Sequence, residues 1–186
     1  MPCALTTGYK LGCRDNVGGI TEIRLAPFTA VTSIVTNASS QVTAITGSVG
    51  SGTTGAGVSG FYKYELPKGV GQFTETINAS TENGTVFYQQ EATLIINKLQ
   101  QAVRNELRLV TTARMMAIVK DRNGRFWLLG KNNGIEVSAG TAQTGTAMGD
   151  RSGYELTLTG MEEEPCVEVT AAAANAVTSS TQTLEG

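Results

Sequence analysis

Apolar and polar residues alternate over many short segments of the chain, a pattern typical of β-strands with one buried face. Two examples are ITEIRLAPF at residues 20–28 and FYKYELP at residues 61–67. Comparable segments occupy residues 30–36, 40–46, 71–79, 85–96, 114–130, 134–138, 154–160 and 166–170. The pattern predicts roughly eight to ten short strands joined by turns.

Asn-Gly pairs predict two hairpins, because they supply the positive φ angles of a tight turn. Asn83-Gly84 separates segments 71–79 and 85–96, and Asn123-Gly124 lies within segment 114–130. The periodicity changes only after Asn97, where several side chains recur at spacings of three and four: Leu99, Ala102, Val103, Glu106 and Leu107. This spacing predicts one amphipathic helix over residues 97–110.

The predicted fold is therefore all-β with one α-helix, an antiparallel β-sandwich or partly open barrel whose open end or edge the helix covers. A chain of 186 residues favours one domain. We expect residues 18–170 to form it, preceded by an N-terminal arm at 1–17. Residues 171–186 lack large apolar side chains and are expected to be a flexible C-terminal tail.

Charged residues make up only 16% of the chain and the net charge is −2, so composition does not favour nucleic-acid binding. No secretion signal and no apolar segment of membrane-spanning length is present, which favours synthesis in a cytoplasm and no membrane partner. Cys3, Cys13 and Cys166 lack CxxC spacing and are interpreted as reduced residues.

The chain has no histidine, which removes the Ser-His-Asp and Cys-His pairs and the usual imidazole metal sites. We therefore expect no enzymatic activity, catalytic residue, metal or cofactor. The cluster Glu162–Glu164 is interpreted as a solvated acidic turn. Asp15, Asp121 and Asp150 each adjoin an arginine in a glycine-containing turn, which suits turn hydrogen bonding better than a calcium or anion site.

Residues 47–60, GSVGSGTTGAGVSG, contain two literal GxGxxG patterns. A dinucleotide site needs a strand before and a helix after such glycines, whereas an aromatic strand follows here. Because the segment has few side chains to bury, we expect it to become ordered at an interface, with residues 139–150 as a secondary contact. The candidate assembly residues are Gly47, Gly50, Gly52, Gly55, Gly57 and Gly60.

Phe126 and Trp127 in GRFWLLG could form a ligand platform, but alternation directs one of them inward, and a core role is favoured.

The order of these elements resembles that of the tail tube (major tail) proteins of long-tailed bacteriophages. The segment DRNGRFWLLGKNNGIEVSAGTAQTGTAMGDRSGYELTLTG at residues 121–160 carries most of the resemblance, and CRDNVGGI at 13–20 adds to it. It implies a two-sheet sandwich with a flanking helix that forms hexameric rings. The inner sheets would join into one barrel, and the rings would stack into a DNA conduit in the virion tail, assembled in the bacterial cytoplasm with other tail proteins. No acidic stripe for the lumen is recognisable in the sequence.

Two other classes of protein are compatible with the pattern. One is another virion component, a head-tail connector or capsid decoration protein, which would form a different ring or a trimer. The other is a β-sandwich carbohydrate-binding module, which would stay monomeric and expose aromatic side chains.

Overall fold

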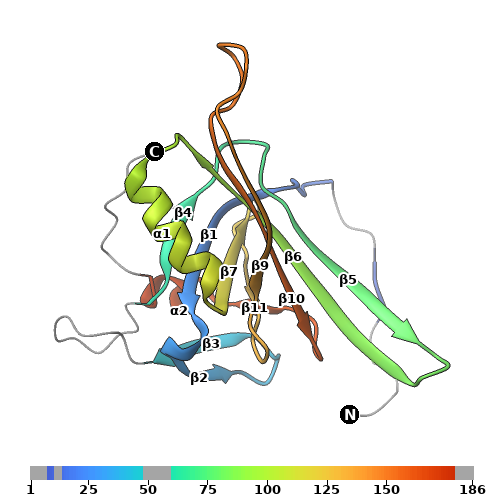
Figure 1. Ribbon diagram of the computed structural model, residues 1–186. Coiled ribbons are helices and arrows are strands. Elements are labelled where there is room, and N and C mark those ends of the chain that lie inside the picture. Colours follow the sequence, from blue (N-terminus) through green and yellow to red (C-terminus); the bar gives the residue numbers. More distant parts are fainter. Residues whose placement is uncertain (1–7, 11–13, 48–59, 179–186) are drawn as a thin grey trace.

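The computed structural model describes residues 8–10, 14–47 and 60–178, which form two facing β-sheets and two helices (Figure 1). The larger sheet has seven strands, in the spatial order β2 (Val31–Thr36), β3 (Val42–Gly47), β11 (Val167–Val169), β8 (Phe126–Leu129), β7 (Met115–Asp121), β1 (Ile20–Pro27) and β4 (Tyr62–Glu65). Its neighbouring strands are antiparallel except for β11 and β3, which are parallel. A short 3-10 helix, Phe28–Ala30, joins β1 to β2.

The smaller sheet has four strands, all antiparallel to their neighbours, in the order β5 (Phe73–Ser80), β6 (Thr85–Asn97), β10 (Gly153–Glu162) and β9 (Glu136–Gln143). Its two hairpins extend past the body of the protein in opposite directions (Figure 1). The sheet is therefore strongly staggered, because β5 continues toward one end and β9 toward the other.

The main hydrophobic core fills the space between the two sheets. Leu94, Leu156 and Leu158 of the smaller sheet lie in one cluster with residues of β1 and β7. Helix α1 (Gln101–Thr112) adds three buried side chains to this cluster: Val103, Leu107 and Val110. The apolar face of the helix thus closes the side of the sandwich next to β9, as its periodicity requires.

A second hydrophobic core lies on the opposite face of the larger sheet. It includes Phe61, Ile118 and Phe126, and it is completed by Ala173 and Ala174 of the short helix α2 (Ala171–Ala176). The larger sheet is therefore covered on both faces, which explains why β1 and β7 consist almost entirely of buried residues.

A buried arginine of β1, Arg24, connects this strand to the C-terminal end of α2. Arg24, which is 4% exposed, forms an ion pair with Glu22 at 2.5 Å. The Arg24 guanidinium also donates to the Ala174 carbonyl at 2.7 Å and to Asn175 Oδ1 at 3.1 Å. Because a buried charge needs all of these partners, Arg24 holds α2 at one position on the sheet.

The all-β expectation is confirmed, and so are both Asn-Gly hairpins, although the described residues form eleven strands. At the β5–β6 turn only Gly84 has a positive φ, of 63°. The expected helix begins at Gln101, later than predicted.

Two expectations need correction. Residues 171–178 were assigned to a flexible tail, but they form α2 and a β-bridge between Thr178 and Phe61. The sequence signal was weak because alanines bury little area, and their small size is what lets α2 approach the sheet closely. At the other end, Asn16 and Val17 of the expected N-terminal arm form hydrogen bonds with Asn123 in the β7–β8 turn.

We predict that Arg24→Met lowers the free energy of unfolding by about 3 kcal/mol, because it leaves the Glu22 carboxylate buried without its partner. Lys131→Met is the control, since it removes an ion pair with Glu164 whose side chain is half exposed, and it should cost less than about 1 kcal/mol. Urea unfolding of the unassembled protein measures both values. Equal stability of the two variants would contradict the structural role assigned to Arg24.

Candidate functional site

The outer face of the smaller sheet has a distinctive composition among the described residues. Because side chains alternate along a strand, the residues next to buried Leu94, Leu156 and Leu158 point away from the core. These outward positions are rich in hydroxyl groups and carboxylates: Thr74, Thr76, Glu91, Thr93, Glu136, Thr141, Glu155, Thr157 and Thr159.

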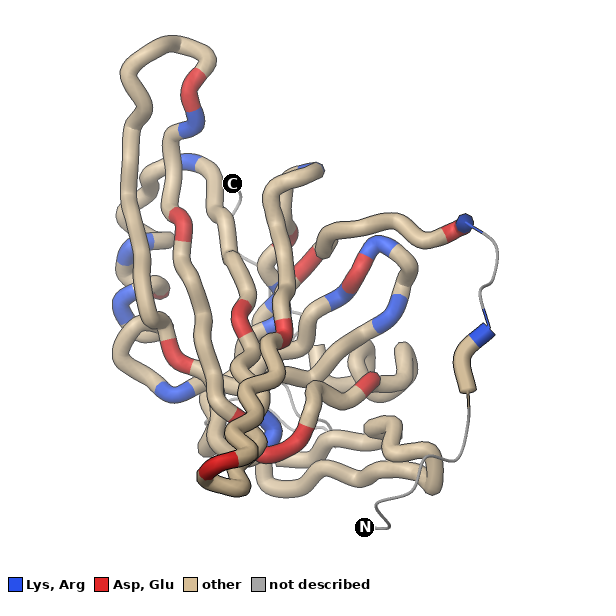
Figure 2. Tube along the Cα trace, turned by 90° about the vertical axis from the view of Figure 1, so that its right-hand side faces the viewer, with Lys and Arg blue, Asp and Glu red and all other residues tan. Residues whose placement is uncertain are grey.

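No lysine or arginine occurs in β5, β6, β9 or β10. In Figure 2 the basic positions lie on α1, on the larger sheet and in loops, whereas the smaller sheet carries acidic positions. Glu91 and Glu136 lie in one row across the sheet with Thr74 and Thr159. Glu155 forms an ion pair with Arg151, which lies just before β10. The outer face is therefore mainly polar and acidic, with Phe87 and Met161 as its exposed apolar side chains, and this arrangement emerges only when the four strands are assembled.

Both edges of this sheet are open in the described part of the chain. β5 pairs only with β6, and β9 pairs only with β10. Protein edge strands are usually protected by lysine, proline or a covering element, because their unpaired N–H and C=O groups can pair with another chain. Neither β5 nor β9 contains a lysine, arginine or proline. The two edges can therefore accept further strands.

One local irregularity occurs in β9. The register with β10 shifts between Thr157 and Leu158, which leaves Ser138 as the extra residue of a β-bulge. The Ser138 hydroxyl lies 2.8 Å from Thr159 Oγ1, and it donates to the Thr157 carbonyl at 3.2 Å. These bonds keep Ser138 on the outer face.

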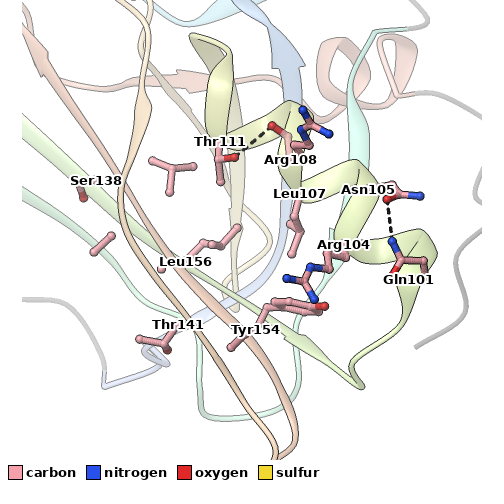
Figure 3. A pocket seen from close by; sticks show the side chains of 14 residues that line it. Gln101, Arg104, Asn105, Leu107, Arg108, Thr111, Ser138, Thr141, Tyr154 and Leu156 are labelled. Carbon is pink, nitrogen blue, oxygen red and sulfur yellow. Dashed lines mark hydrogen bonds between the residues drawn. The ribbon is translucent and has the colours of Figure 1, made fainter.

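A groove of about 670 Å³ lies between α1 and the open edge at β9 (Figure 3). Leu107, Tyr154 and Leu156 point into it, and Arg104 lies beside Tyr154 (Figure 3). The β9 side is built from small residues, Ser138 to Ala142. A Cβ atom on Gly140 would lie 2.7 Å from Leu156 Cδ2, so a larger residue here would require the Leu156 side chain to shift.

The helix side of the groove is basic. Arg104 and Arg108 lie one turn apart on α1, and both are exposed. Among the described residues neither forms an ion pair. The groove thus combines an apolar floor, two free cations and an open strand edge.

Buried polar contacts fix the smaller sheet to loops of the larger one. Glu75 of β5 accepts hydrogen bonds from the Cys166 backbone N–H at 2.7 Å and from Gln90 Nε2 at 3.3 Å. Gln90 in turn accepts from the Gly130 N–H at 3.0 Å. Since each of these groups is shielded from water, a shift of β5 would leave several of them without partners.

Glu162 was expected in a solvated turn, but it is 2% exposed. Its carboxylate accepts hydrogen bonds from the backbone N–H groups of Asn132 and Asn133, at 3.1 and 2.8 Å. Burial raises the pKa of Glu162 above its usual value, although these hydrogen bonds act in the opposite direction. Glu162 lies an even number of residues from the buried Leu156 and Leu158, so strand alternation was the available signal that its side chain points inward.

The structure describes two of the predicted assembly glycines, Gly47 and Gly60. Gly47 ends β3, and a Cβ there would lie 1.9 Å from the Ala30 carbonyl oxygen, so close packing explains this glycine. Gly60 is buried just before β4. Gly50, Gly52, Gly55 and Gly57 lie outside the described residues. Residues 139–143 of the second predicted contact belong to β9.

The remaining candidates have structural roles. Asp121 accepts a hydrogen bond from the Arg125 N–H, and Asp150 accepts from the N–H groups of Thr146 and Ala147, so both stabilise turns. Phe126 is buried in the second core and Trp127 packs against the main core. The described residues contain no group of three or more metal-ligating side chains.

Searches of protein-family models, curated proteins and solved structures find no match to this chain. No helix in the described ranges is long and apolar enough to cross a membrane.

Burial and the neighbouring Glu75 carboxylate raise the pKa of the Cys166 thiol to about 12. In a Cys3→Ser/Cys13→Ser variant we expect Cys166 to react slowly with Ellman's reagent at pH 8, since only about one thiol in ten thousand is ionised. Glu75→Gln should accelerate the reaction by removing the negative charge, whereas Glu91→Gln on the outer face should not. Equal rates in these variants would show that Glu75 does not face Cys166.

Proposed function

We propose that this chain is the structural subunit of a phage tail tube, which self-assembles into stacked hexameric rings around a DNA conduit. The observation that carries the proposal is the smaller sheet, which has two open edges in the described part of the chain and no lysine or arginine in its four strands. The hexamer and the tube come from the resemblance of the sequence to tail tube proteins, and the sheet supplies a physical route to both.

The direction of the edge strands supports ring formation. Each strand of the smaller sheet is antiparallel to its neighbour, and the sheet has four strands, so β5 and β9 run in opposite directions. A copy rotated about an axis along the strands can therefore add its β5 to β9 as an antiparallel neighbour. The contact joins two different surfaces, so repeating it produces a closed ring when the rotation closes.

Ring closure would also remove the exposed edges, because only a closed barrel leaves no unpaired strand. Six copies of the four-stranded sheet contribute 24 strands to such a barrel. At a spacing of about 4.8 Å and the tilt usual in barrels, these strands enclose a backbone diameter of about 50 Å. A barrel of this width can pass a DNA duplex.

The chemistry of the outer face suits the lining of such a conduit. Proteins hold DNA mainly through lysines and arginines that neutralise phosphates and release counterions. A lining of threonines with Glu91 and Glu136, and with Glu155 paired to Arg151, offers few such contacts, and the two unpaired carboxylates repel phosphates at short range. DNA could therefore move along the bore without being held.

The two projecting hairpins provide material for contacts between rings. They point in opposite directions along the strands, so the two ends of a ring would present different surfaces (Figure 1). At the β9–β10 tip Met148 is fully exposed, and the β5–β6 arm exposes Val86. Stacking would bury these apolar side chains, and the segment 48–59 remains the candidate for a further contact.

Under this proposal the protein has no catalytic role and belongs to the virion tail. Its partners would be copies of itself and other tail proteins, and it would need no cofactor or membrane.

The test is the assembly state of the purified protein, measured by sedimentation velocity and negative-stain electron microscopy. We expect sixfold rings and tubes. Rings of another symmetry that do not stack would favour a connector, and trimers would favour a decoration protein. A monomer at all concentrations, with binding to glycans, would favour a carbohydrate-binding module and overturn the proposal.

A further inference from the structure

We infer that β5 of one copy pairs with β9 of the next in one particular register, which places Ile77 in the groove beside α1. In this register Ser80 lies opposite Glu136, Ile77 opposite Gly140, and Thr74 opposite Gln143. The inference rests on the proposed self-assembly, and it specifies the contact that a ring would use.

The lengths of the two edges support full pairing. β5 and β9 each contain eight residues. Within one subunit, however, the two strands barely overlap along the strand direction. Thr74, near the start of β5, lies in the same row across the sheet as Glu136, at the start of β9. Glu91 and Thr159 lie between them in this row. A second copy placed beside the first without sliding would leave almost all of both edges unpaired. Full pairing requires the second copy to slide along the strands until Ser80 reaches Glu136.

The required slide agrees with barrel geometry. Ser80 lies six residues beyond Thr74 on β5, a distance of about 20 Å, while the four strands of one copy span about 19 Å. Repeating this slide tilts the strands by about 45° from the ring axis, close to the 35–45° usual in closed barrels. The stagger between β5 and β9 therefore corresponds to the strand tilt that a closed barrel requires.

The faces of the two strands also match in this register. On β5, Thr74, Thr76, Asn78 and Ser80 point to the outer face, because Phe73 packs against the core. On β9, Glu136 points outward while Val137 packs inward, and the bulge at Ser138 places Ala139 and Thr141 outward as well. Counting past the bulge puts Asn78 opposite Ala139 and Thr76 opposite Thr141. Apart from Ser138 in the bulge, every outward residue then meets an outward residue.

The inward positions place Ile77 over the groove. Ile77 is 64% exposed in the subunit, which is costly for a large aliphatic side chain. Opposite it lies Gly140, and the open groove beside α1 is lined by Gly140, Leu156 and Leu107. Ile77 of the second copy can fill this space and cover the apolar floor between Leu156 and Leu107.

Arg104 lies beside Tyr154 at one end of the groove and has no ion pair among the described residues (Figure 3). The Glu75 carboxylate is held within its own subunit by the Cys166 N–H and by Gln90. The contact between copies therefore rests on backbone pairing of two edges of equal length and on the seating of Ile77.

The register can be tested by disulfide cross-linking in a variant whose three natural cysteines are replaced by serine. Thr76→Cys/Thr141→Cys should give a ladder of covalent multimers on oxidation. Thr76→Cys/Ala139→Cys, which samples a register two residues away, should give about tenfold less product, because diagonal pairs exceed the usual disulfide distance. Equal or greater cross-linking by the second pair overturns the inferred register.

The seating of Ile77 is tested separately. Ile77→Asp should abolish rings and tubes while the circular dichroism spectrum stays unchanged, because the side chain is exposed in the subunit. Leu109→Asp is the matched control: Leu109 is 63% exposed on α1 but does not line the groove, so assembly should persist. Assembly by Ile77→Asp at the wild-type level overturns the seating alone. A wild-type protein that never assembles overturns the inference together with the proposed function.

Discussion

Backbone hydrogen bonding at the two edges of the smaller sheet is the constraint on which the rest of the account depends. Every strand presents N–H and C=O groups on both sides, and β5 and β9 satisfy only one side within the subunit. The edges lack the lysines and prolines that protect edge strands in monomeric proteins. A second copy supplies the missing bonds without changing the fold, since the edges run in opposite directions.

The larger sheet makes this exposed arrangement possible. Its two faces are buried, one by the main core, which it shares with the smaller sheet, and the other by the second core with α2. Hydrogen bonds from Arg24 hold α2 on one face of the larger sheet. The contacts of Glu75 and Gln90 attach β5 and β6 to loops of the larger sheet. The smaller sheet can therefore extend past the core at both ends and still present rigid edges.

The sequence predicted those elements whose pattern is local. Gly84 and Gly124 located the hairpins, and the spacing of Val103 and Leu107 located α1. The far half of β9 was missed because Ala139 to Gln143 lacks large apolar residues, and only pairing with β10 makes it a strand. Helix α2 was missed for a related reason, since its alanines are buried by close approach and not by size.

The candidate site was largely invisible in the sequence, because it depends on the order of strands that are distant along the chain. Glu91 and Glu136 lie in the same row across the sheet only when β6, β10 and β9 are paired. The glycines of segment 47–60 became candidates because the segment is rich in glycine. Gly140, which lines the groove, is a single glycine within a strand and gives no such signal.

The orientation of the smaller sheet in an assembled tube tests the account most directly, and helical reconstruction by cryo-electron microscopy would measure it. The account predicts that the sheets of neighbouring copies join into one continuous barrel with Glu91, Glu136 and Glu155 facing the bore. A reconstruction in which this face lies on the outside of the tube, or in which β5 and β9 remain unpaired, would contradict it.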